Sequence, residues 1–139
     1  MIDRVLVPMD DSEMAQKALE YALGAFGDAE ITVLHVVGKS TPMMGEMAGL
    51  ALEDDLQTAA EERASEVFDI ARKIAEEHDT EITTTVAIGH PARTIIEKSE
   101  KFDTVVIGSH SGSIVDRLFV GNVAEKVFRG APVPVMVIR

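Results

Sequence analysis

The chain has 139 residues, a length that predicts one domain over residues 1–139 with a hydrophobic core of its own. Its 13 Lys and Arg stand against 24 Asp and Glu, and a formal net charge of -11 would repel the phosphate backbone, so no nucleic-acid partner is expected. The lack of cysteine excludes disulfides and thiolate metal sites. No segment has the pattern of a signal peptide or a membrane span, and we therefore expect a cytoplasmic protein.

The first half of the chain predicts strands and helices in alternation. A short apolar run over residues 4–8 predicts a strand, and apolar residues at helical spacing over residues 14–26 predict a helix after it. The apolar run over residues 30–37 is continuous, which indicates a strand buried on both faces of a parallel sheet. Helical spacing over residues 50–77 predicts the longest helix.

The second half continues this alternation. Residues 81–88 alternate in part, which predicts a strand near a sheet edge, and Pro91 lies in the first turn of a following helix. Residues 103–107 predict a buried strand, residues 122–129 a short helix and residues 133–138 a terminal strand. Such a pattern predicts an α/β fold with an open parallel sheet and helices on both faces. Ligands bind such sheets beyond the carboxyl ends of the strands, where the strand order reverses.

The stretch from Gly108 to Val123 links a predicted buried strand to a helix and is rich in small residues. Small residues let backbone amides approach an anion, and a helix beginning at Asn122 would direct its N–H groups and positive dipole end toward that anion. The stretch matches neither the Walker A pattern nor the dinucleotide-binding glycine pattern. The residues by themselves leave a phosphate site and a purely structural loop equally open.

Several segments together resemble the universal stress protein family over nearly the whole chain. They are, in order, RVLVPMDDSE, LHVV, GHPARTII, VVIGSHS and GNVAEKVFRGAPVPVMVIR. The resemblance implies a Rossmann-like, adenine nucleotide alpha hydrolase-like fold, with an open five-stranded parallel sheet in the order 3-2-1-4-5. It also implies a stress-response regulator or sensor that binds an adenine nucleotide. ATP is the first choice ahead of ADP and AMP, with Mg²⁺ held by the phosphates.

This chain matches the glycine pattern of the family at two of its four positions, Gly108 and Gly121. Members that bind ATP have Gly, two residues, Gly, nine residues, Gly, and then Ser or Thr; Gly108, Ser111, Gly121 and Asn122 occupy these positions. A side chain at Ser111 disfavours positive φ, although Gly112 beside it could relax the turn. Asn122 offers an amide donor in place of a hydroxyl and is also a good helix cap. We therefore expect a weakened or altered phosphate contact.

The same resemblance implies contacts to the ribose and the base. Asp10 would accept hydrogen bonds from both ribose hydroxyls, while capping of the first helix is the other role open to it. Val36 would present backbone groups to the adenine edge, and Ile107 would pack on the base. The complete set of predicted nucleotide contacts is Pro8, Met9, Asp10, Val36, Ile107, Gly108, His110, Ser111, Gly112, Gly121, Asn122 and Val123.

The predicted partners follow from the family and from the terminal strand. In this family the last strand pairs with its copy in a second subunit, so residues 133–138 predict a homodimer interface, and a further protein partner remains open. His35, His90 and His110 all lie at strand ends, but they lack the spacing of a zinc site, so no metal site made of protein side chains is predicted. The methionines at 43, 44 and 47 are expected to pack beneath a loop, with a lid over the ligand as the alternative.

Three other functions are alternatives to nucleotide sensing. A receiver domain shares the acidic pair after the first strand, but it needs an Asp at the end of the third strand, where this chain has Ile88 and Gly89. An enzyme is not favoured, because the sequence has no cysteine, no serine flanked as a nucleophile elbow and no pair of carboxylates with an obvious acid and base division, and at most slow ATP hydrolysis is expected. The remaining alternative is a dimeric protein-interaction module that binds no nucleotide, which the departures at Ser111 and Asn122 keep open.

Overall fold

Five strands form one parallel sheet in the computed structural model, which describes residues 1–38, 53–109 and 122–139. The strands are β1 (Arg4–Pro8), β2 (Glu30–Val37), β3 (Thr83–Ile88), β4 (Thr104–Gly108) and β5 (Val135–Ile138). Their order is β3-β2-β1-β4-β5, and every pairing is parallel. The predicted fold class and strand order are therefore confirmed, and so is the edge position of the third strand.

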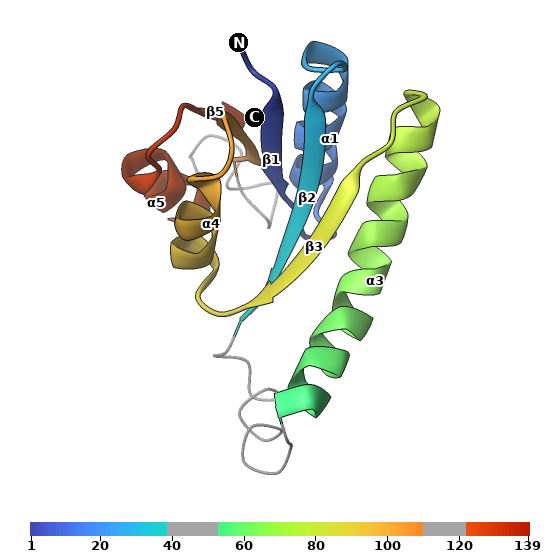
Figure 1. Ribbon diagram of the computed structural model, residues 1–139, viewed down its shortest axis with the longest axis vertical. Helices are drawn as coiled ribbons and strands as arrows, with labels where there is room; N and C mark the ends of the chain where they lie inside the picture. Colours follow the sequence, from blue (N-terminus) through green and yellow to red (C-terminus); the bar gives the residue numbers. More distant parts are fainter. Residues whose placement is uncertain (39–52, 110–121) are drawn as a thin grey trace.

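Among the described residues, two helices cover each face of this sheet. They are α1 (Glu13–Ala25), α3 (Glu53–Glu77), α4 (Pro91–Ser99) and α5 (Asn122–Gly130). The helices α1 and α3 pack together on one face, and α4 and α5 pack together on the other. Figure 1 shows this arrangement, with α3 on one side of β2 and β3 and the pair α4 and α5 on the other side.

Alternation along the strands divides the core between the two faces. In β1, Val5 and Val7 pack toward α1 and α3, whereas Leu6 packs toward α4 and α5, and all three side chains are fully buried. Leu6 lies opposite Thr32 of β2 on one side and Val105 of β4 on the other. The central strand is thus buried on both faces and both edges, which explains its continuous apolar sequence.

The predicted element boundaries needed small corrections. The strand predicted over residues 81–88 begins at Thr83, because extending the register of β3 on β2 would place Glu81 directly opposite Glu30. The strand predicted over residues 133–138 begins at Val135, after a proline that has no N–H to donate. The other predicted strands and helices begin and end within one residue of those in the structure. Residues 50–52, the predicted start of the longest helix, lie outside the described ranges. The methionines at 43, 44 and 47 also lie outside them.

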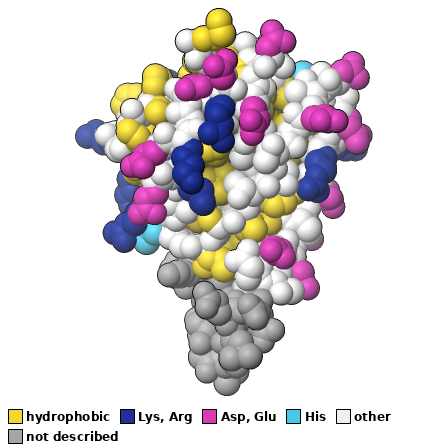
Figure 2. Space-filling model, in the orientation of Figure 1, with side chains coloured by type: hydrophobic (Ala, Val, Ile, Leu, Met, Phe, Trp, Pro, Cys, Tyr) yellow, Lys and Arg dark blue, Asp and Glu magenta, His cyan; other side chains and the backbone are white. Residues whose placement is uncertain are grey.

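The chain is acidic, with a formal net charge of -11. On the face shown in Figure 2, the Lys and Arg side chains lie in a few groups, and Asp and Glu side chains are scattered around them. Phe128 of α5 is the most exposed aromatic side chain among the described residues, at 61%. Within the described ranges, no helix combines the length and the apolar character needed to cross a membrane.

A carboxylate closes the amino ends of the central strands. Asp103, just before β4, accepts hydrogen bonds at Oδ2 from the backbone N–H groups of Asp3 (2.8 Å) and Arg4 (2.9 Å). These two bonds hold the pKa of Asp103 below its ordinary value of 3.8. The Arg4 guanidinium also lies over the ring of Phe102, 5.0 Å from its centroid.

The Asp103 carboxylate should make part of the free energy of unfolding depend on pH. Because the folded-state pKa of Asp103 is lowered, its contribution is fully present above the unfolded-state value of 3.8 and is lost as pH falls through the folded-state pKa. We expect Asp103→Ala to lower the urea midpoint at pH 7, and the difference from wild type to shrink as the pH falls below 4. Asp28→Ala is the control, since Asp28 is exposed in the turn after α1. A constant difference between Asp103→Ala and wild type from pH 7 to pH 3 would contradict this role.

Candidate functional site

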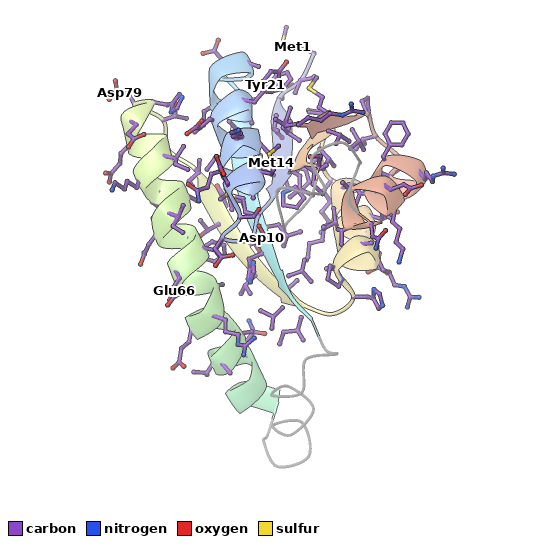
Figure 3. The ribbon with its side chains drawn as sticks, turned by 180° about the vertical axis from the view of Figure 1, so that it is seen from behind. Met1, Asp10, Met14, Tyr21, Glu66 and Asp79 are labelled. Carbon is purple, nitrogen blue, oxygen red and sulfur yellow. The ribbon has the colours of Figure 1, made fainter. Side chains whose placement is uncertain are left out.

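The strand order reverses between β1 and β4, and the first predicted site residues lie there. Pro8 ends β1 and is buried, and Met9 follows it with its N–H bonded to the carbonyl oxygen of Leu34 at 2.8 Å. Asp10 comes next and is half-buried. Figure 3 shows Asp10 beside the start of α1, whereas Tyr21, further along the helix, lies toward the other end of the molecule. Residues 8–10 thus reach the edge at which parallel sheets bind ligands.

The cap of α1 is Ser12 and not an aspartate. Ser12 Oγ accepts the N–H of Ala15 at 3.1 Å, which satisfies one of the unpaired donors of the first turn. Asp10 Oδ1 accepts the N–H of Ser12 at 2.9 Å, so its carboxylate is fixed in place by the chain two residues ahead. Within the described part of the chain, Oδ2 of Asp10 has no hydrogen-bond partner. Asp10 is therefore oriented by the helix start while one oxygen stays available.

His35 supports the turn that carries Asp10, a contact that sequence reasoning missed. Its Nδ1 lies 2.8 Å from the carbonyl oxygen of Met9. Because a carbonyl oxygen only accepts, Nδ1 must be the donor in this contact. The only signal in the sequence was a polar residue within an apolar strand.

Gly108 ends β4 in close contact with the backbone of α1. A Cβ at this position would lie 2.7 Å from the carbonyl oxygen of Met14 and 3.1 Å from the N atom of Ala15. From the sequence, Gly108 was predicted to let backbone amides approach an anion. The structure shows a second reason for it, since it lets β4 and the first turn of α1 come together beside Asp10.

The predicted base contacts lie on the other face of the sheet. Val36 of β2 is half-buried and Ile107 of β4 is 6% exposed, and both pack with the cluster under α4 and α5. Met9 belongs to the opposite cluster, under α1 and α3. The predicted residues therefore surround the carboxyl edge from both faces.

The helix α5 begins with two predicted contacts, Asn122 and Val123, whose side chains are exposed. Since β4 and β5 are parallel and α5 lies in the crossover between them, α5 runs back along the strands and begins toward their carboxyl ends. Asn122 is the first residue of α5. Gly121 and the other predicted contacts His110, Ser111 and Gly112 lie outside the described residues.

One further histidine and one serine complete the description of this edge. His90 precedes α4 and is exposed, with no side-chain hydrogen bond to the helix start. No group of three or more His, Asp or Glu side chains suited to a metal ion occurs within the described ranges. Ser109, directly after β4, is 1% exposed, although it was not among the predicted contacts.

The comparisons with known proteins identify the family. The model of the universal stress protein family matches residues 1–139, and the chain belongs to this family. A universal stress protein of Methanocaldococcus jannaschii, MJ0531, is 30% identical over 98% of this chain and 81% of its own length. The solved structure of MJ0577 from the same organism superposes with a TM-score of 0.80, at 25% identity over 99% of this chain and 96% of that one.

Two other solved structures of the family contain nucleotides. One is a universal stress protein in complex with cAMP, with a TM-score of 0.70 and 19% identity over 99% of this chain and 97% of that chain. The other is the universal stress protein from Archaeoglobus fulgidus in complex with dAMP, with a TM-score of 0.67 and 20% identity over 100% of this chain and 98% of that chain. At these identities the likeness shows a shared fold.

Proposed function

We propose that this chain is a stress-response regulator that binds an adenine nucleotide, with ATP preferred, between the carboxyl ends of β1 and β4. The observation that carries the proposal is Asp10, whose carboxylate is fixed by the Ser12 N–H and keeps Oδ2 available at the point where the strand order reverses. A carboxylate in this place can accept from the two hydroxyls of a ribose. The cAMP and dAMP complexes of the two proteins with the same fold support the choice of an adenine nucleotide.

The remaining parts of the site are assigned by chemistry. Val36 would present its backbone groups to the adenine edge, Ile107 would pack on the base, and the start of α5 at Asn122 offers backbone donors to phosphates. The phosphates would carry Mg²⁺, whose charge would also reduce repulsion from the acidic protein. Binding without a dedicated catalytic group fits a sensor in the cytoplasm, which at most hydrolyses ATP slowly.

The experiment identifies any small molecule that the purified protein retains by mass spectrometry and then titrates the emptied protein with ATP, ADP and AMP by calorimetry. We expect a retained adenine nucleotide and saturable heat, with the highest affinity for ATP. If nothing is retained and all three titrations are flat, the nucleotide proposal is wrong and the dimeric protein-interaction module becomes the better account.

The proposal includes a homodimer through the terminal strand. β5 is an edge strand, and its four residues, all apolar, are only half-buried. An edge of this kind is normally protected by pairing with another strand. Sedimentation equilibrium should give twice the chain mass of 15.0 kDa, and a single chain at micromolar concentration would contradict the dimer.

A further inference from the structure

His35 is a polar side chain within the apolar strand β2. Val33 and Ile31, two and four residues before it, are fully buried in the cluster under α1 and α3. Because side chains alternate along a strand, the half-buried ring of His35 lies on the same face. A polar ring among apolar neighbours needs a hydrogen-bond partner, and His35 finds one in the turn that follows β1.

Met9, the first residue after β1, is held to β2 through both of its backbone groups. Its N–H donates to the carbonyl oxygen of Leu34, and its own carbonyl oxygen accepts from Nδ1 of His35, each at 2.8 Å. The second bond is made by a side chain, at a point where β1 has already ended. Because the peptide unit is planar, fixing the carbonyl group of Met9 also fixes the direction in which the chain enters Asp10.

Asp10 is therefore tied to β2 through His35. Its side chain is held separately, since Oδ1 accepts the N–H of Ser12 at 2.9 Å. The bond to Ser12 lies within the turn and would move with it, whereas the bond from His35 connects the turn to the sheet. The hydrogen bond of His35 thus sets where the Asp10 carboxylate lies relative to β2.

The residue that follows His35 in β2 is Val36, whose backbone groups are proposed to meet the edge of the base. His35 thus links the strand that would hold the base to the turn that would hold the ribose. We propose that His35 is a positioning residue, which holds the Asp10 carboxylate at the distance from Val36 that a ribose requires and so sets the preference for ribonucleotides over deoxyribonucleotides. This proposal rests on the proposed function and adds to it a discrimination between two sugars.

The test compares ATP with 2′-deoxy-ATP, since the two differ only in the 2′-hydroxyl. Wild type should bind ATP roughly tenfold more tightly, the effect of one hydrogen bond to a charged group. His35→Leu removes the donor and should bind the two nucleotides equally. His35→Asn should keep most of the wild-type ratio, because its amide nitrogen is a donor at the same number of bonds from the backbone as Nδ1. Calorimetric titration measures each affinity, and thermal melting without ligand measures the stability of each variant.

His78→Leu is the matched control. Nδ1 of His78 lies 3.0 Å from the carbonyl oxygen of Ile74, so this variant removes an imidazole contact of the same kind. His78 directly follows α3, before the amino end of β3, and Figure 3 shows its neighbour Asp79 far from Asp10. The control should therefore keep the wild-type ratio of affinities. His35→Ala also lacks the donor and takes the place of His35→Leu if the leucine variant does not fold.

The outcomes separate this inference from the proposed function. If the variant without the donor keeps the wild-type ratio, His35 serves the fold alone and the inference is wrong, whatever the melting temperature. If His35→Asn or His78→Leu also binds the two nucleotides equally, the hydrogen bond of His35 does not explain the loss and the inference fails. A wild type that binds both nucleotides equally contradicts the ribose contact and this inference, while nucleotide binding stands. A wild type that binds neither overturns the proposed function itself.

Discussion

Replacing Gly108 with alanine is expected to destabilise the fold by about 3 kcal/mol, the upper range for an extra methyl group forced into a packed region. The new Cβ would lie 2.7 Å from the carbonyl oxygen of Met14 and 2.8 Å from its carbonyl carbon, both backbone atoms of α1. The helix cannot move away easily, because Met14 and Ala15 are both about 5% exposed and packed in the core. Urea unfolding followed by circular dichroism measures the change.

Gly24→Ala is the control for this prediction. Gly24 lies inside α1, and a Cβ there would meet nothing within 4 Å. The substitution should stabilise the protein by up to about 1 kcal/mol, because alanine favours the helix over glycine. Opposite signs for the same chemical change in the two variants would support the close contact between β4 and α1. An unchanged urea midpoint for Gly108→Ala would refute it.

Replacing Asp10 should cause the largest loss of nucleotide affinity. If its carboxylate accepts from both ribose hydroxyls, Asp10→Ala removes two hydrogen bonds to a charged group, and each is worth about 1.5 kcal/mol or more. The affinity for ATP should therefore fall by roughly a hundredfold. Asp10→Asn should lose less, because its amide oxygen can still accept the N–H of Ser12 as Asp10 does. Calorimetric titration of each variant with ATP measures both effects.

A deoxynucleotide and a neighbouring aspartate serve as the controls. Wild type should bind 2′-deoxy-ATP more weakly than ATP, and Asp10→Ala should bind the two equally, since its ribose contacts are already lost. Asp11→Ala removes an exposed carboxylate one position away and should change the affinity for ATP by less than about twofold. If Asp11→Ala and Asp10→Ala weaken ATP equally, general charge and not a ribose contact explains the effect.

Most of the fold could be predicted from local sequence, because its central strands are buried on both faces. The continuous apolar runs of β1 and β2 have no other common explanation in a chain of alternating helices and strands. The strand order could not be derived in this way, since nothing local says that β1 pairs with β4; it came from the family resemblance. The start of β3 was predicted two residues too early, because the juxtaposition of Glu81 and Glu30 can be recognised only when the register of β3 on β2 is known.

The candidate site could be predicted in its position but less well in its parts. Asp10 was found because it follows a strand, but its bond to Ser12 and the capping by Ser12 are matters of local geometry. The contact of His35 with Met9 was missed because it joins two strands whose residues are distant in sequence. Gly108 was assigned to one role, and its contact with Met14 comes from the packing of segments that are distant in sequence.

At the amino ends of the central strands, the Asp103 carboxylate accepts a hydrogen bond from the backbone N–H of Asp3, a residue 100 positions away in the sequence. During synthesis the strands β1, β2 and β3 emerge first, and the second edge of β1 stays open until most of the chain has left the ribosome. Because such distant pairings must form before the central strand is complete, refolding should be slower than in helical proteins of this size, which rapid-mixing kinetics can measure. Until β4 pairs with β1, the apolar edge of β1 is unpaired, and an unpaired edge of this kind promotes aggregation of the nascent chain.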